Sequence, residues 1–81
     1  MNATIACDVC LDAVSIIDSE ANVTNATVAV IGKAIEIMCG LIGGSIVSGE
    51  CRFIIDSIEN ISKWLDEGLN RSQICKRLKL C

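Results

Sequence analysis

The chain contains no histidine, no proline and no tyrosine, and it has one phenylalanine and one tryptophan among its 81 residues. Without histidine there is no Ser/His or Cys/His catalytic arrangement, no imidazole to complete a zinc site and no side chain that titrates near neutral pH. The absence of proline favours long helices. The shortage of aromatic side chains for stacking argues against nucleic acid as a partner. We therefore predict a protein that is not an enzyme and needs no metal or cofactor.

Cysteine and aliphatic residues are what the chain has in quantity. Eighty-one residues form one domain at most, here taken as 1–81, near the length below which a core rarely suffices alone. Six cysteines offer crosslinks. Cys7 and Cys10 have the spacing of zinc ligands, but Cys75 and Cys81 are too far apart for a second half-site. Disulfides are therefore expected, which indicates a secreted protein or one in a secretory or lysosome-like vesicle.

The amino-terminal segment does not resemble a signal peptide. It carries three aspartates within twenty residues and no basic start. We expect a mature domain processed from a precursor. Sequons for N-glycosylation occur at Asn2 and at the four candidate sites Asn22, Asn25, Asn60 and Asn70, a density compatible with secretion.

Apolar residues recur at spacings of three and four, which predicts an all-α fold. The predicted helices cover residues 4–21, 25–41 and about 50–67, followed by a short last helix. A turn over 22–25 and a glycine-rich break over 40–49 separate the first three. Gly68 should end the third helix, and Asn70 with Gln73 should form a capping box for the last. Short strands over 28–31 and 53–55 are the alternative, but no alternation of period two supports them.

The second predicted helix is more apolar than one core-facing stripe requires. Val30, Ile37 and Leu41 widen its apolar face, and only Lys33 and Glu36 interrupt it. Such a helix is either buried nearly all round or in contact with lipid. A transmembrane span is not expected, because the uninterrupted run is too short and two charges lie within it.

The carboxyl-terminal stretch Cys75-Lys-Arg-Leu-Lys-Leu-Cys81 holds two cysteines that cannot share a helical face, since six residues correspond to a rotation of about 120°. Cys81 must therefore lie beyond the last full turn. Antiparallel terminal helices would bring Cys7 to Cys81 and Cys10 to Cys75, which leaves Cys39 and Cys51 to close a short loop. Six cysteines permit fifteen pairings, and the sequence alone does not choose among them.

The net charge of −3 combines an acidic body with a basic end. Four cations near the carboxyl terminus are candidates for contact with anionic lipid headgroups. The alternative is a solvated helix end whose cations complement the helix dipole. Trp64 is either an interfacial anchor or a core residue, and Met38 and Phe53 are expected in the core. The candidate membrane contacts are Arg71, Lys76, Arg77, Lys79 and Trp64.

The cysteine frame resembles that of saposin-like proteins: Cys7-x2-Cys10, a close central pair, and Cys75-x5-Cys81 in an aliphatic helical chain. The basic end and the lack of aromatics are most similar to amoebapores, the pore-forming peptides of amoeboid protists. The resemblance implies four or five amphipathic helices in a folded leaf, three nested disulfides and lipid as the partner. Amoebapores carry a histidine, taken to govern pH-dependent dimer formation, where this chain has Lys79.

The first functional hypothesis is therefore a protein that binds phospholipid membranes and permeabilises anionic, bacterial-type ones. Protonation of carboxylates below about pH 5 would make the chain net cationic and favour this activity. A homodimer or higher oligomer on the membrane is included in this hypothesis. The alternatives are a non-lytic saposin-type protein that binds or transfers lipid or activates a lipid hydrolase, and a plain domain released from a precursor.

Overall fold

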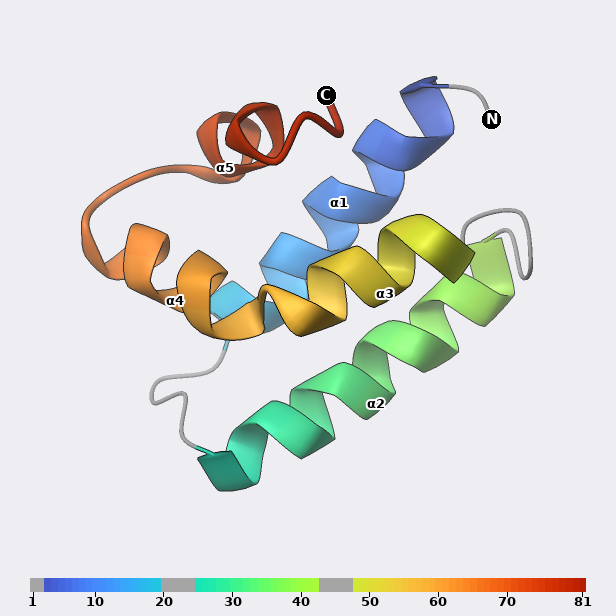
Figure 1. Ribbon diagram of the computed structural model, residues 1–81, viewed down its shortest axis with the longest axis horizontal. Coiled ribbons are helices and arrows are strands. Elements are labelled where there is room, and N and C mark those ends of the chain that lie inside the picture. Colours follow the sequence, from blue (N-terminus) through green and yellow to red (C-terminus); the bar gives the residue numbers. More distant parts are fainter. Residues whose placement is uncertain (1–2, 20–24, 43–47) are drawn as a thin grey trace.

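The computed structural model describes residues 3–19, 25–42 and 48–81, and within these ranges the chain forms five α-helices and no strand (Figure 1). The all-helical fold is confirmed, including over the two segments weighed as strands. The saposin-like arrangement of the helices stays a prediction. The helices are α1 (Ala3–Asp18), α2 (Asn25–Ile42), α3 (Ser48–Asp56), α4 (Ile58–Asp66) and α5 (Arg71–Arg77).

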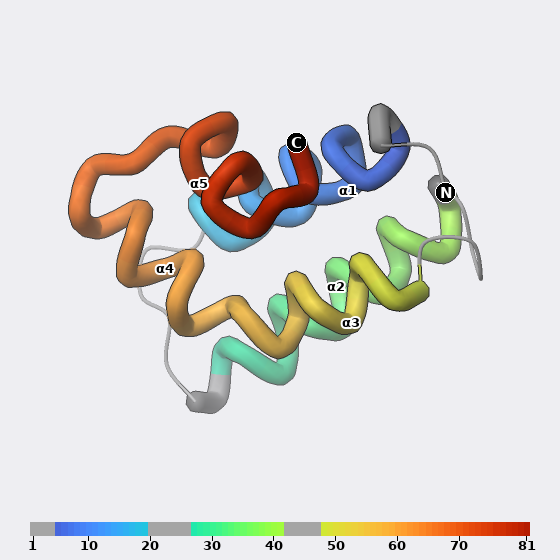
Figure 2. Tube along the Cα trace, turned by 45° about the horizontal axis from the view of Figure 1, so that its top comes forward, coloured from blue at the N-terminus to red at the C-terminus, as the bar shows by residue number. Residues whose placement is uncertain are grey.

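Helix α1 lies at the centre of the arrangement, in contact with each of the other four helices. Helices α2 and α3 run antiparallel beside each other, and α4 continues from α3 towards the far end of the molecule (Figure 1). Helix α5 returns to pack on α1 (Figure 2). The resulting body is flattened, with extents of 31 × 24 × 16 Å.

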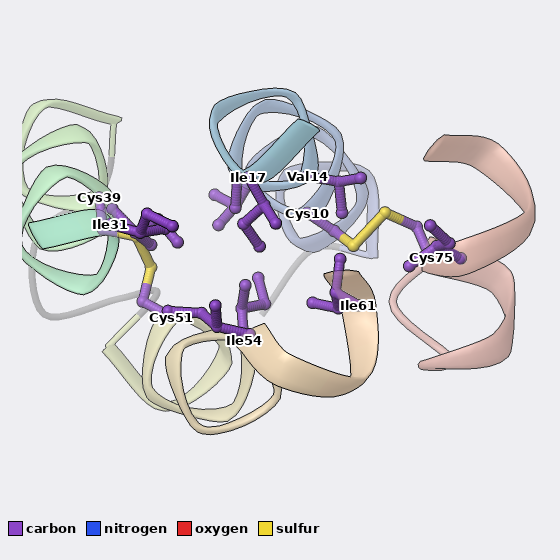
Figure 3. Close-up of a cluster of buried hydrophobic side chains, with 14 residues drawn as sticks. Cys10, Val14, Ile17, Ile31, Cys39, Cys51, Ile54, Ile61 and Cys75 are labelled. Atoms are coloured by element: carbon purple, nitrogen blue, oxygen red, sulfur yellow. A yellow bond between two sulfur atoms is a disulfide. The ribbon is translucent and has the colours of Figure 1, made fainter. Parts of the chain in front are cut away.

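The core is built from aliphatic side chains and cysteines of all five helices (Figure 3). On each helix these residues are spaced three or four apart, which gives every helix the core-facing apolar side that the sequence predicts. Met38 and Trp64 are partly buried against this core. The buried cluster consists of Val9, Cys10, Ala13, Val14, Ile17, Ile31, Ile35, Cys39, Cys51, Ile54, Ile58, Ile61, Ile74 and Cys75.

All six cysteines are in disulfides, as expected. Cys7 pairs with Cys81 and Cys10 with Cys75, at Cα–Cα distances of 4.5 and 5.9 Å, so both bonds tie the carboxyl-terminal segment to α1. Cys39 pairs with Cys51 and joins α2 to α3 across a sequence separation of 12. Taken alone, each crosslink stabilises the fold by roughly 3–4 kcal/mol in the chain-entropy model.

The predicted third helix is divided in two at Ser57, which corrects the expectation of one continuous helix. The amide of Ser57 donates to the Ile54 carbonyl three residues back, rather than to the carbonyl four residues back. Its hydroxyl donates to the Phe53 carbonyl at 2.8 Å. A serine that bonds to its own backbone in this way bends a helix. The amide of Ile61 donates to the Ser57 carbonyl, so α4 begins directly after the bend.

Two further expectations need correction. Helix α1 ends at Asp18 instead of residue 21, and the Ser19 hydroxyl donates to the Ile16 carbonyl at 2.7 Å beyond that end. Most of the predicted turn, residues 22–24, lies outside the described residues. Phe53 is 46% exposed and not in the core. It follows Cys51 by two positions, a rotation of about 200° that carries it away from the core-facing side of α3.

The predicted end of α4 and start of α5 are confirmed. Gly68 has a φ of 96°, and its amide and that of Leu69 donate back to the last turn of α4, closing a Schellman motif. Asn70 then caps α5. Its side-chain oxygen accepts a hydrogen bond from the backbone N–H of Gln73, and the side-chain oxygen of Gln73 accepts one from the backbone N–H of Asn70. These local signals fix the corner that directs α5 back onto α1.

Candidate functional site

The first candidate surface is an aliphatic stripe on the outside of α2, formed by Val30, Ile37 and Leu41. Their side chains are 66%, 59% and 84% exposed. At about 100° per residue the three lie within about 40° of one another, and the stripe extends about 16 Å along the helix. Three large aliphatic groups are therefore aligned towards solvent on one face.

The stripe exists because α2 is apolar on two faces. Ile31, Ile35 and Cys39 face the core, and the centre of the stripe lies about 140° around the helix from them. The core occupies one face and leaves the other without cover from the described residues. The sequence pattern contained this signal, since the same residues widened the predicted apolar face. Contact of this face with lipid was one of the two alternatives predicted for the helix, although Val30, Ile37 and Leu41 were not named among the individual candidate membrane contacts.

The second candidate surface is the basic carboxyl-terminal segment. Helix α5 ends at Arg77, and Lys79 follows with a φ of 62°. The amides of Lys79 and Leu80 donate to the carbonyls of Lys76 and Cys75, which closes a second Schellman motif. The chain therefore leaves the helical path and brings Cys81 to Cys7. This geometry confirms that Cys81 lies beyond the last turn.

The structure gives the predicted membrane contacts different surroundings. The Arg71 guanidinium donates to the Ser15 hydroxyl at 2.6 Å, and that hydroxyl donates to the Leu11 carbonyl, so Arg71 joins α5 to α1. Arg77 lies over the Trp64 ring, 5.2 Å from its centroid. A guanidinium at this distance has a favourable cation–π interaction.

Trp64 is thus only partly a core residue. Trp64 is partly buried against the core, and Arg77 lies over its ring. Lys76 and Lys79 are exposed. The structure brings Trp64 and Arg77 together and places the two lysines on the same terminal segment. Whether these residues touch lipid stays a prediction.

The aliphatic stripe and the basic segment lie on different sides of the molecule. Helix α2 is at one edge and α5 at the opposite edge, with α1 and the α3–α4 helices between them (Figure 3). The same separation is visible along the chain trace (Figure 2). Because α2 and α5 lie at opposite edges, we expect a flat bilayer that contacts the stripe not to reach the basic segment of the same molecule.

The candidate glycosylation sites fall in different places. Asn60 is exposed on α4. Asn70 is exposed, and its side-chain oxygen caps α5. Asn25 begins α2, although its side chain is outside the described set. Asn2 and Asn22 lie outside the described residues.

No described helix is both long enough and apolar enough to cross a membrane. Within the described ranges, no group of three or more potential ligand side chains is placed to hold a metal ion. Comparison with known proteins found no matching family model, no similar curated protein and no similar solved structure.

Proposed function

We propose that this chain is a saposin-like lipid-binding protein that attaches to phospholipid membranes and permeabilises anionic ones, favoured at acidic pH. The observation that carries the proposal is the stripe of Val30, Ile37 and Leu41, exposed on a helix whose other face already fills the core. Aligned aliphatic side chains on one helix face are the typical means by which a protein enters the boundary between headgroups and acyl chains. The disulfides keep α5 on α1 and α3 beside α2 while this face is transferred into lipid.

Charge supplies the preference for anionic lipid. The basic carboxyl-terminal segment holds Lys76, Lys79 and the Arg77–Trp64 pair. Each cation close to an anionic surface contributes about 1 kcal/mol to membrane binding. At neutral pH ten carboxylates outnumber seven cations, which gives the net charge of −3. The net charge becomes positive once more than three carboxylates are protonated. Because model carboxylates titrate near pH 4, binding should strengthen in an acidic vesicle.

The second candidate is a non-lytic protein that binds or transfers lipid. The placement of α2 and α5 at opposite edges of the molecule favours it (Figure 3), because we expect a single copy to present either the stripe or the basic segment to a bilayer, but not both. For permeabilisation, neighbouring copies bound in different orientations would present the stripe and the basic segment to the same bilayer. Both functions place the protein outside the cell or in a lysosome-like vesicle.

Release of a trapped dye from phosphatidylglycerol vesicles tests the proposal. With the disulfide-bonded protein, we expect leakage to rise as the pH falls from about 5 to about 4, the range in which model carboxylates protonate. Binding without leakage at any pH would favour the non-lytic function. No binding at any pH would refute both, and a transition centred near neutral pH would contradict the charge mechanism, because the chain has no histidine.

A further inference from the structure

A groove of about 350 Å³ lies between α2 and α3, close to the disulfide that joins them. Its lining includes the Cys39–Cys51 disulfide, Glu36 and Gly40 from α2, and Arg52 and Ile55 from α3. The volume is within the range of small-molecule sites. The groove borders the core at Cys39 and Cys51, and it shares no lining residue with the aliphatic stripe or the basic carboxyl-terminal segment.

The charges of the groove are of both signs and come from different helices. Glu36 and Arg52 are exposed side chains that line the same space. Arginine binds phosphate oxygens in a planar, two-pronged geometry. A carboxylate accepts hydrogen bonds from an ammonium group. Together they complement a ligand that carries one phosphate and one ammonium group a few bonds apart.

The lining also distinguishes between kinds of ammonium group. A quaternary ammonium has no N–H to donate and is recognised by aromatic rings. No aromatic side chain is among the described residues that line the groove. A primary ammonium donates hydrogen bonds that Glu36 accepts. The groove therefore favours ethanolamine over choline.

We propose that the α2–α3 groove binds the phosphoethanolamine headgroup of a membrane lipid, with the phosphate at Arg52 and the ammonium at Glu36; this inference rests on the proposed membrane function. Leu41 supports a lipid over a free metabolite. It directly follows Gly40, is 84% exposed and belongs to the stripe proposed to enter lipid. A bilayer reached by Leu41 brings headgroups to the mouth of the groove.

Gly40 provides a variant that fills the groove without disturbing the helix. A Cβ atom at Gly40 meets no atom within 4 Å, and leucine is a better helix former than glycine. Gly40→Leu should therefore fold at least as well as the parent and occupy part of the groove. Gly49→Leu is the matched control, because a Cβ at Gly49 also meets nothing within 4 Å and Gly49 does not line the groove.

The first arm of the test titrates the intact protein with glycerophosphoethanolamine and follows backbone amides by NMR. We expect shifts around the groove and an affinity at least about fivefold higher than for glycerophosphocholine. Gly40→Leu should abolish the shifts, and Gly49→Leu should retain them. Glu36→Gln and Arg52→Gln should each weaken binding about threefold to fivefold, as suits exposed charges. Equal binding of both ligands, or full binding by Gly40→Leu, would overturn the assignment.

The second arm measures binding to phosphatidylglycerol vesicles that contain either phosphatidylethanolamine or phosphatidylcholine. We expect a preference for the ethanolamine vesicles that Gly40→Leu removes and Gly49→Leu keeps. Strong but equal binding to both kinds of vesicle would refute the groove as a site for the ethanolamine headgroup, while the proposed membrane function would stand. If the soluble headgroup binds but the protein shows no preference between the two kinds of vesicle, the ligand of the groove is not a membrane lipid. Absence of vesicle binding, with the headgroup still bound, would refute the membrane function instead.

Discussion

Replacing Leu41 by glutamine tests the proposed contact between the aliphatic stripe and lipid. Leu41 is 84% exposed, so the substitution removes little packing from the folded protein, and glutamine is a good helix former. Complete burial of a leucine side chain is worth about 1.5–3 kcal/mol. Transfer of the exposed part into lipid is then worth roughly 1.3–2.5 kcal/mol, and its loss should weaken vesicle binding about 10- to 70-fold.

The measurement is co-sedimentation with phosphatidylglycerol vesicles at about pH 4.5, in the range where model carboxylates are partly protonated. The free energy of unfolding, determined in urea, should change by less than about 0.5 kcal/mol. Phe53→Gln is the matched control, because Phe53 is 46% exposed but belongs to α3 and not to the stripe. It should reduce binding less than Leu41→Gln does. Unchanged binding of Leu41→Gln, with the fold intact, would refute the stripe as the lipid contact.

Two further predictions concern the fold that presents these surfaces. Ile35→Ala should lower the free energy of unfolding by about 2–5 kcal/mol, because Ile35 is fully buried. Ile37→Ala, two residues along the same helix and 59% exposed, should change the free energy of unfolding by less than about 0.5 kcal/mol. Equal losses for Ile35→Ala and Ile37→Ala in urea denaturation would contradict the orientation of α2, in which Ile35 faces the core and Ile37 faces solvent. Lys79→Gly should raise the melting temperature, with a gain of about 0.5–1 kcal/mol, since Lys79 has a φ of 62° that glycine adopts without strain. Lys76→Gly is the control, because Lys76 lies inside α5, and it should lower the free energy of unfolding by a similar amount. A loss of stability in Lys79→Gly would contradict the left-handed conformation of Lys79.

Local sequence signals predicted the helices and several of their ends. Asn70 and Gln73 satisfy each other's backbone amides, and Gly68 adopts a left-handed conformation that glycine accepts without strain. The same holds for the position of Cys81, because the rotation between Cys75 and Cys81 excludes a shared helical face. Ser57 is the exception, because no local signal marks the bend there. Its bend depends on one side-chain hydrogen bond inside a continuous helical pattern.

By itself, the sequence determined an all-helical, disulfide-bonded domain, because helix periodicity and caps depend on residues only three or four positions apart. Only the tertiary structure decided which apolar face of α2 fills the core and which is exposed. Periodicity marks both faces as apolar, and the choice depends on where α1 and α3 pack. The groove and the distance between the stripe and the basic end were decided in the same way. Glu36 and Arg52 belong to different helices, and only the packing of α2 beside α3 places their charges along one groove.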